Sequence, residues 1–293
     1  MLFPPTLGSG SRIAIVAPAS PFPWTDLCAG LAWLGARYEL VTTARIFART
    51  GYLAGSDEDR ARELAHAFAR DDVGAIVCAR GGYGLVRILD RLPWDALLAR
   101  PKWIVGFSDV TALHLDASAH GIASIHASNV TGLARPSAAL PRTRRSLLRA
   151  LEGRPRAPFD GLRVLRRGSA TGPLFGGNLT LLATLAAAGK LRIPDGAIVL
   201  LEDVTERPYR IDRMLTSLRI GGHFERASAV VFGDFDACGP GPDGVTVDDV
   251  LEDFCARVTL PVATGAPFGH ADRNEAFVHG EAASLDADVL RFR

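Results

Sequence analysis

The chain has 293 residues, 48% of them hydrophobic and 22% charged, and its formal net charge at pH 7 is +1. A chain of this length can bury a large core and is expected to form two domains rather than one. The nearly balanced charge excludes a global electrostatic field for nucleic acid or a membrane surface. No stretch approaches the roughly 18 apolar residues that predict a membrane span, so we expect a cytoplasmic protein.

The first half of the chain alternates between short apolar runs and helix-like segments. Residues 56–72 begin with the capping-box pattern of Ser56 and Asp59 and continue with apolar residues at helical spacing. The alternation predicts right-handed crossovers, a parallel sheet, and ligands beyond the carboxyl ends of the strands. The expected strands are residues 12–20, 38–43, 74–80 and 103–107.

A glycine-rich turn, RGGYG at 80–84, follows the third of these strands. Its glycines permit a close backbone approach to a ligand, so the amides could bind an oxyanion or a phosphate. The turn lacks the spacing of the dinucleotide and P-loop motifs, which makes the nucleotide interpretation weak. A plain tight turn is the alternative.

The fourth strand ends in GFSD, residues 106–109. A serine on a tight turn between a buried strand and a helix has the exposure that an acyl-transfer nucleophile needs, and the helix amides point to the same space. Val110 stands where the G-x-S-x-G motif has its second glycine. From this stretch alone, a role for Ser108 as the N-cap of a helix over 109–120 is favoured.

Residues 136–168 contain nine arginines and four prolines, against Glu152 and Asp160 as the acidic residues. A basic stretch of this kind could be a nucleic-acid arm. The prolines, the short apolar stubs and the lack of an aromatic ladder favour an exposed connection between domains with one short helix.

The sequence of the second half predicts a smaller α+β domain with a β-rich core. Among the seven histidines, His270 stands out because it lies in a Gly/Pro-bounded loop directly after a strand. Glu202 and Asp203 end a buried apolar strand, where a carboxylate needs a partner such as an imidazolium. The alternative for Asp203 is a helix N-cap, whereas His114 is expected to have a packing or surface role.

The four cysteines are widely scattered, with no CxxC pair and no histidine at metal-ligand spacing. A disulfide framework or a zinc site is therefore not expected. No metal or organic cofactor is implied.

Five blocks in one order closely resemble the LD-carboxypeptidases, a serine peptidase family that also includes the microcin C immunity hydrolases. The resemblance spans nearly the whole chain and implies a Rossmann-like α/β domain with a parallel sheet, followed by an α+β domain like a swivelling β-barrel. The expected boundaries are 1–135 for the first domain, 136–168 for the linker and 169–293 for the second domain. The blocks are RGGYG (80–84), GFSDVTALH (106–114), LFGGNLTLLATL (174–185), LLEDVTERPYRIDRML (200–215) and FGHADRNEAFVHGEAASLD (268–286).

The resemblance also implies roles for individual residues. Ser108 would be the nucleophile, Glu202 the orienting acid and His270 the general base. The backbone amides of Asp109 and Gly82 would form the oxyanion hole. This set would be a Ser-His-Glu triad that acts through an acyl-enzyme.

The family's murein branch removes the terminal D-alanine from murein tetrapeptides during cell-wall recycling. A free terminal carboxylate calls for an arginine, and Arg80 is the candidate. The chain has no obvious inserted active-site loop, which favours the murein branch over the acyl-aspartyl adenylate hydrolases. A non-catalytic muropeptide-binding protein is the alternative from another class. The expected partners are a murein peptide and a second copy of the chain, with no nucleic acid and no membrane.

Overall fold

The computed structural model describes all 293 residues, and the chain divides into two compact units. Unit 1 comprises Met1–Pro155 and Glu275–Val278, and unit 2 comprises Arg156–Asn274 and His279–Arg293. The expected connecting segment, 136–168, is therefore divided at Pro155, and its one helix belongs to unit 1.

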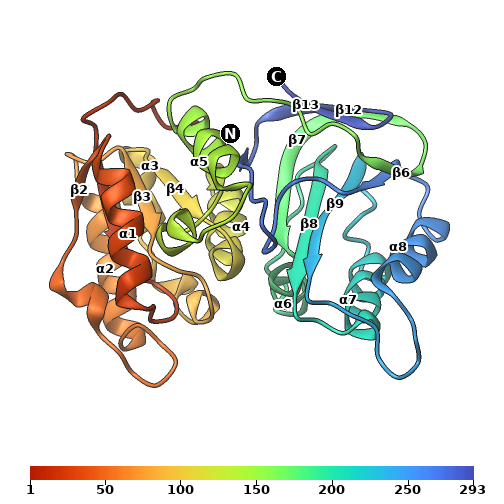
Figure 1. Cartoon of the computed structure of the whole chain (residues 1–293), viewed down its shortest axis with the longest axis horizontal. Helices are drawn as coiled ribbons and strands as arrows, with labels where there is room; N and C mark the ends of the chain where they lie inside the picture. Colours follow the sequence, from red (N-terminus) through yellow and green to blue (C-terminus); the bar gives the residue numbers. More distant parts are fainter. The chain divides into compact units, whose positions relative to one another are not determined.

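Unit 1 is built on a six-stranded sheet in the order β11-β5-β4-β3-β1-β2 (Figure 1). All neighbouring strands are parallel except β11, which pairs antiparallel with β5. The predicted parallel sheet is confirmed, although its strands are shorter than the apolar runs. The strands are β1 (Arg12–Val16), β2 (Glu39–Val41), β3 (Ala75–Cys78), β4 (Trp103–Gly106), β5 (Ile125–His126) and β11 (Phe277–Val278).

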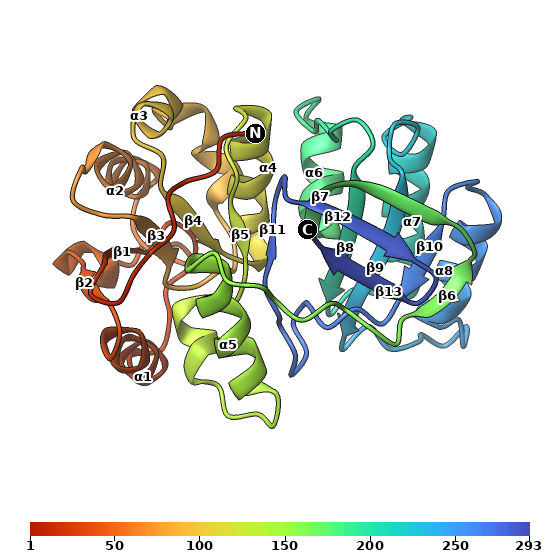
Figure 2. The same cartoon turned by 90° about the horizontal axis from the view of Figure 1, so that it is seen from above.

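Helices cover both faces of this sheet, with α1 and α5 on one face and α2, α3 and α4 on the other (Figure 2). The predicted cap of α2 is confirmed, because Ser56 Oγ accepts a hydrogen bond from Asp59 N at 3.1 Å. The helices are α1 (Trp24–Gly35), α2 (Asp57–Ala69), α3 (Trp94–Ala99), α4 (Thr111–Ala119) and α5 (Leu140–Leu151). Short 3₁₀ turns lie at Ala44–Phe47, Leu85–Arg87, Leu89–Arg91, Ser108–Val110 and Val130–Ala134.

Unit 2 contains a seven-stranded, curled sheet in the order β13-β12-β7-β8-β9-β10-β6 (Figure 1). Its four middle strands, β7 to β10, are parallel, and the outer strands are antiparallel to their neighbours. The strands are β6 (Arg163–Arg166), β7 (Ser169–Asn178), β8 (Ile198–Val204), β9 (Ala229–Asp236), β10 (Val262–Thr264), β12 (Ala282–Asp286) and β13 (Val289–Phe292). The helices α6 (Leu179–Ala187), α7 (Pro208–Ile220) and α8 (Val247–Ala256) line one face (Figure 2).

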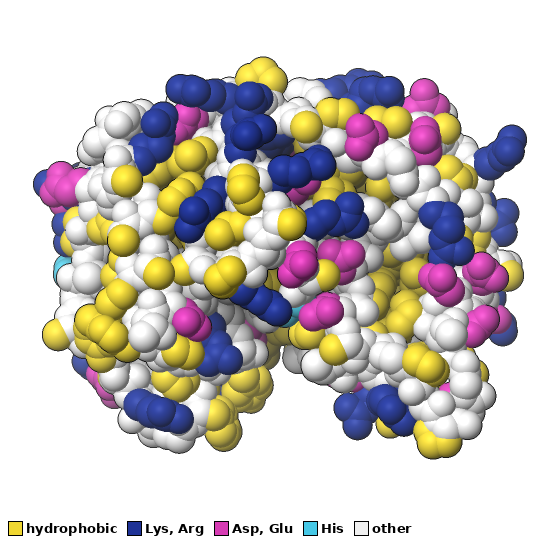
Figure 3. All heavy atoms as spheres, viewed as in Figure 1, with side chains coloured by type: hydrophobic (Ala, Val, Ile, Leu, Met, Phe, Trp, Pro, Cys, Tyr) yellow, Lys and Arg dark blue, Asp and Glu magenta, His cyan; other side chains and the backbone are white.

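The arginines of 136–168 mostly contact groups of the chain itself. Some bind carboxylates and others bind backbone carbonyls, which fits the interpretation of this stretch as structural. The pairs are Arg142 with Glu275, Arg144 with Leu133 O, Arg156 with Glu281, Arg163 with Asp248, and Arg166 with Cys255 O. On the face drawn in Figure 3, basic and acidic side chains are interspersed. None of the helices has both the length and the apolar character of a membrane span.

Candidate active site

Ser108 occupies a strained turn directly after β4. Its φ is 66°, in the left-handed region that residues with a side chain rarely adopt. The helix α4 begins only after the 3₁₀ turn Ser108–Val110, and no side chain makes a capping hydrogen bond at its start. The interpretation of Ser108 as a helix N-cap is therefore wrong, since an N-cap has extended backbone and a bonded side chain.

Two polar side chains hold the backbone on the strand side of this turn. Asn129 Oδ1 accepts from Phe107 N at 3.2 Å, and its Nδ2 donates to Phe107 O at 3.4 Å. The buried His114 lies 2.9 Å from Gly106 O through Nε2 and 2.9 Å from Ser124 Oγ through Nδ1. Because a carbonyl only accepts, Nε2 carries the proton and Nδ1 accepts from the serine hydroxyl.

Burial lowers the pKa of His114 to about 4, although the bond to Gly106 O opposes the shift. The ring is therefore neutral at physiological pH. It supports the backbone in front of the turn at Ser108, which confirms the packing role that its position in the sequence indicates.

The glycine turn after β3 lies against Ser108. A Cβ placed on Gly81 would be 2.8 Å from Ser108 Cβ and 3.1 Å from its Oγ. Gly82 has a φ of 104°, and a Cβ there would be 2.4 Å from Ser20 Oγ, which accepts from Tyr83 N at 3.1 Å. Glycine is therefore required at both positions, first for contact with the serine and then for the left-handed turn.

The side chain of Asp109 joins the two turns. It is buried, and its Oδ2 accepts from Leu85 N at 2.9 Å, just beyond the glycine turn. Burial raises the pKa of this carboxyl to about 6, while the Leu85 amide and Arg60 act in the opposite direction. The carboxyl thus fixes the turn after β3 against the residue that follows Ser108.

Arg80 is exposed at the start of the glycine turn, and its Nη1 donates to Pro21 O at 2.5 Å. This bond ties together the loops after β1 and β3. The role of Arg80 in substrate binding stays a prediction.

In unit 2, Glu202 and His270 form a close pair. Glu202 lies fully buried near the carboxyl end of β8, and His270 lies in the loop after β10. His270 Nδ1 donates to Glu202 Oε2 at 2.6 Å, which leaves Nε2 as the ring nitrogen able to accept a proton. Burial lowers the pKa of His270, but the charge and hydrogen bond of Glu202, together with Asp203 and Asp236, outweigh it and raise the pKa overall.

Asp203 has a structural role at the end of β8. Its carboxylate accepts from Asn178 Nδ2 at 2.9 Å and from both the N and Oγ1 of Thr180, at 2.9 and 2.8 Å. Burial raises its pKa to about 6. The alternative of a helix cap is wrong, because the N-cap of α7 is Arg207 and the bonds of Asp203 reach the start of α6 instead.

Sequence reasoning missed two residues of these surroundings. Asn129 lies in a loop beyond β5, and no sequence pattern links it to the turn at Ser108. Asp234 follows an apolar run in β9, the same signal that identified Glu202, and this signal could have found it.

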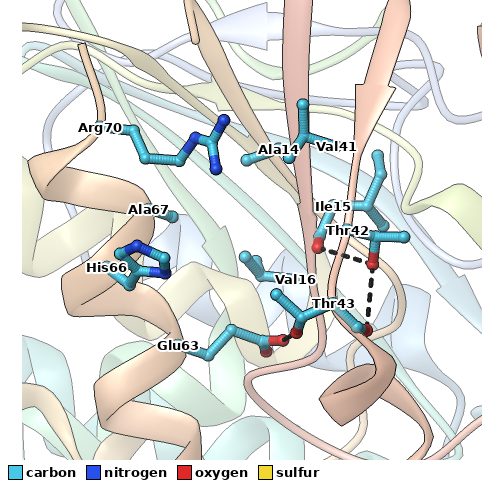
Figure 4. A pocket seen from close by; sticks show the side chains of 10 residues that line it. All are labelled: Ala14, Ile15, Val16, Val41, Thr42, Thr43, Glu63, His66, Ala67 and Arg70. Atoms are coloured by element: carbon cyan, nitrogen blue, oxygen red, sulfur yellow. Dashed lines mark hydrogen bonds between the residues drawn. The ribbon is translucent and has the colours of Figure 1, made fainter. Parts of the chain in front are cut away.

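A shallow pocket in unit 1 lies between α2 and the strands β1 and β2 (Figure 4). Its polar lining includes Glu63, which accepts from Ala17 N at 2.8 Å and from Arg45 Nη2 at 2.6 Å. None of the candidate catalytic residues lines this pocket.

Comparison with family models defines the class of protein. Residues 13–127 match the model of an LD-carboxypeptidase N-terminal domain, and residues 171–285 match that of an LD-carboxypeptidase C-terminal domain. The class is therefore that of the serine carboxypeptidases, which are hydrolases. The chain belongs to the LD-carboxypeptidase family, as the five sequence blocks predict.

Individual relatives agree with this assignment. The murein tetrapeptide carboxypeptidase of Pseudomonas aeruginosa is 34% identical, over 96% of this chain and 95% of the relative. The crystal structure of muramoyltetrapeptide carboxypeptidase from Oxalobacter formigenes matches with a TM-score of 0.85 and 28% identity, over 96% and 97% of the two chains. The microcin C7 self-immunity protein MccF matches with a TM-score of 0.90 at 20% identity, over 100% and 99%, which shows a shared fold. The predicted fold class is thereby confirmed.

Proposed function

We propose that the protein releases terminal D-alanine from murein tetrapeptides by hydrolysing the L,D bond, with Ser108, His270 and Glu202 as a catalytic triad. The observation that carries the proposal is the 2.6 Å hydrogen bond from His270 Nδ1 to Glu202 Oε2, because it fixes the tautomer that a general base needs. The strained backbone of Ser108 supports its role as nucleophile. The murein tetrapeptide carboxypeptidase of P. aeruginosa supports the choice of substrate.

The mechanism follows from the chemistry of these groups. Ser108 Oγ attacks the scissile carbonyl as its proton passes to His270 Nε2, and Glu202 stabilises the imidazolium. The amides of Asp109 and Gly82 donate to the oxyanion, each worth about 3 kcal/mol of transition-state stabilisation. His270 then protonates the leaving D-alanine amine. In the second half-reaction His270 takes a proton from the water that attacks the acyl-enzyme, and it returns this proton to Ser108 Oγ as the peptide acid leaves.

Recognition of the substrate terminus rests on charge. Arg80 would bind the free carboxylate of D-alanine, exchanging its bond to Pro21 O for a stronger, charge-assisted one.

The protein would act on recycled murein peptides in the cytoplasm, as a homodimer. Light scattering on the purified protein measures the mass in solution, and a monomer at working concentration contradicts the dimer.

The test is the release of D-alanine from a murein tetrapeptide by the wild type and by Ser108→Ala. We expect release by the wild type alone. The variant Ser9→Ala makes the same substitution at an exposed position of the same unit and should keep full activity.

Release by Ser108→Ala at the wild-type rate would refute the triad. If the wild type releases no D-alanine, the substrate assignment fails, and acyl-aspartyl adenylates become the next substrates to assay. A fluorophosphonate that labels the wild type but not Ser108→Ala would show a reactive serine independently of the substrate.

A further inference from the structure

Three buried carboxylate oxygens in unit 2 accept no hydrogen bond. One of them, Oε2 of Glu206, has a nitrogen of Arg210 at 3.5 Å as an ion-pair partner, and the other two lie on neighbouring strands. These two are Oε1 of Glu202 and Oδ2 of Asp234. The second oxygen of Glu202 binds His270, and the second oxygen of Asp234 has an arginine nitrogen of Arg273 only at 4.0 Å. A buried acceptor without a donor is costly, and two of them on one pair of strands point to a missing proton.

The two side chains are neighbours across β8 and β9. The register of these strands shifts between Leu201 and Asp203, which pair with Phe232 and Phe235, so Glu202 stands opposite the segment that contains Asp234.

Both carboxylates also pack around one glycine. A Cβ placed on Gly269 would be 3.2 Å from Glu202 Cβ and Oε2 and 3.3 Å from Asp234 Cβ. The backbone of Asp234 is fixed in this place by its amide, which donates to Phe268 O at 2.9 Å. The loop that carries His270 thus lies against the carboxylate of Glu202 and the Cβ and backbone amide of Asp234.

The charges around Asp234 disfavour its ionisation. The pKa of Asp234 is raised to about 6, chiefly by burial; Arg273 opposes this shift, and the charges of Glu202 and Asp236 support it. The Arg273 side chain is half exposed, and at 4.0 Å it makes no hydrogen bond to the carboxyl group. Asp203 completes the acidic groups at these strand ends, and its own oxygens are bonded to the start of α6.

We propose that Glu202 and Asp234 share one proton, with the carboxyl O–H of Asp234 donating to Glu202 Oε1. One proton then satisfies both orphaned oxygens, and the pair keeps a single negative charge opposite His270. Asp234 is a positioning residue: it holds the Glu202 carboxylate so that Oε2 stays on His270 Nδ1. The inference rests on the proposed function for the role of Glu202, but the protonation of Asp234 can be measured without turnover.

The first experiment compares Asp234→Asn with Asp234→Ala. The asparagine amide donates to Glu202 Oε1 as the protonated carboxyl does, whereas alanine cannot. We expect kcat/KM of Asp234→Asn to stay within about threefold of the wild type, with an unchanged acid limb in its pH profile. Asp234→Ala should lose roughly tenfold to a hundredfold, by analogy with the loss seen when the hydrogen-bond partner of a metal-ligating side chain is removed.

Two outcomes would overturn the proposal. If Asp234 is ionised in the working enzyme, asparagine removes a negative charge, and the acid limb set by His270 moves to lower pH. Equal activities of the Asn and Ala variants, with unchanged profiles, would leave Asp234 with a structural role only.

The second experiment is infrared difference spectroscopy on Ser108→Ala, with and without Asp234→Asn. At pH 5, below the pKa of about 6, we expect a protonated-carboxyl band in the first protein and a loss of the part that belongs to Asp234 in the second. Asp286→Asn makes the same substitution at an exposed position of the same unit, should leave the band in place and serves as the matched control. A band that loses no part in the second protein refutes the shared proton, whatever the assay of D-alanine release has shown.

Discussion

Protonation of His114 couples the stability of unit 1 to pH. The buried ring accepts from Ser124 and donates to Gly106 O, and its burial makes a second, charged ring proton unfavourable. The pKa falls from 6.5 to about 4 on folding because burial disfavours the charged ring. At 1.36 kcal/mol per pKa unit, this shift corresponds to about 3 kcal/mol.

The direction follows from proton binding. Below about pH 6.5 the unfolded chain binds a proton at His114 that the folded protein rejects, so the free energy of unfolding falls as the pH falls. The loss is complete near pH 4, where the folded ring also protonates. Carboxyls with raised pKa values, such as Asp109, act in the opposite direction, and a variant is needed to isolate the histidine.

The assay is urea unfolding of the wild type and of His114→Gln at pH values from 7 to 4. Glutamine can donate to Gly106 O and accept from Ser124, but it does not titrate. The variant should gain about 3 kcal/mol on the wild type across this range, because the carboxyl contributions cancel in the difference. A difference that stays flat refutes the neutral buried ring. Tryptophan fluorescence reports unit 1 selectively, since the tryptophans are Trp24, Trp33, Trp94 and Trp103.

Two substitutions test the remaining geometry. Glu202→Gln should lower kcat/KM on the order of 10⁴-fold. It should also move the acid limb of the pH profile to lower pH, because the charge that raises the pKa of His270 is gone. An acid limb that does not move contradicts the pairing of Glu202 with His270. Gly106→Ala would place a Cβ 2.7 Å from Asn129 Oδ1 and should cost about 1–3 kcal/mol of unfolding free energy. Gly8→Ala, which meets no atom within 4 Å, is the control and should be nearly neutral, whereas equal costs for the two variants would refute the packing argument.

The sheet of unit 1 was predictable because strands covered on both faces are continuous apolar runs. The runs overestimate strand length where apolar residues continue into buried loops. Residues 12–20 are an example, since β1 ends at Val16 while Ala17 and Ala19 stay buried. Burial, rather than pairing, determines how far such a run extends.

The errors at Ser108 and Asp203 have a common cause. Both residues have side chains that cap helices well, and both precede a helical pattern. Ser108 is not a cap because its φ is positive. Asp203 is not a cap of the following helix because its side chain binds Thr180, 23 residues earlier at the start of α6. Backbone strain and distant partners of this kind leave no local pattern in the sequence.

The strand β11 joins a late segment of the chain to the sheet of unit 1. Glu275–Val278 leaves unit 2, pairs with β5 in unit 1, where Phe277 stacks on His126 at 4.5 Å, and the chain then returns to unit 2. A fragment that stops at Pro155 would therefore expose an open sheet edge, the kind of surface on which chains associate. The residues Glu275–Val278 thus belong to the first folding unit, so no single cut in the chain separates the two units.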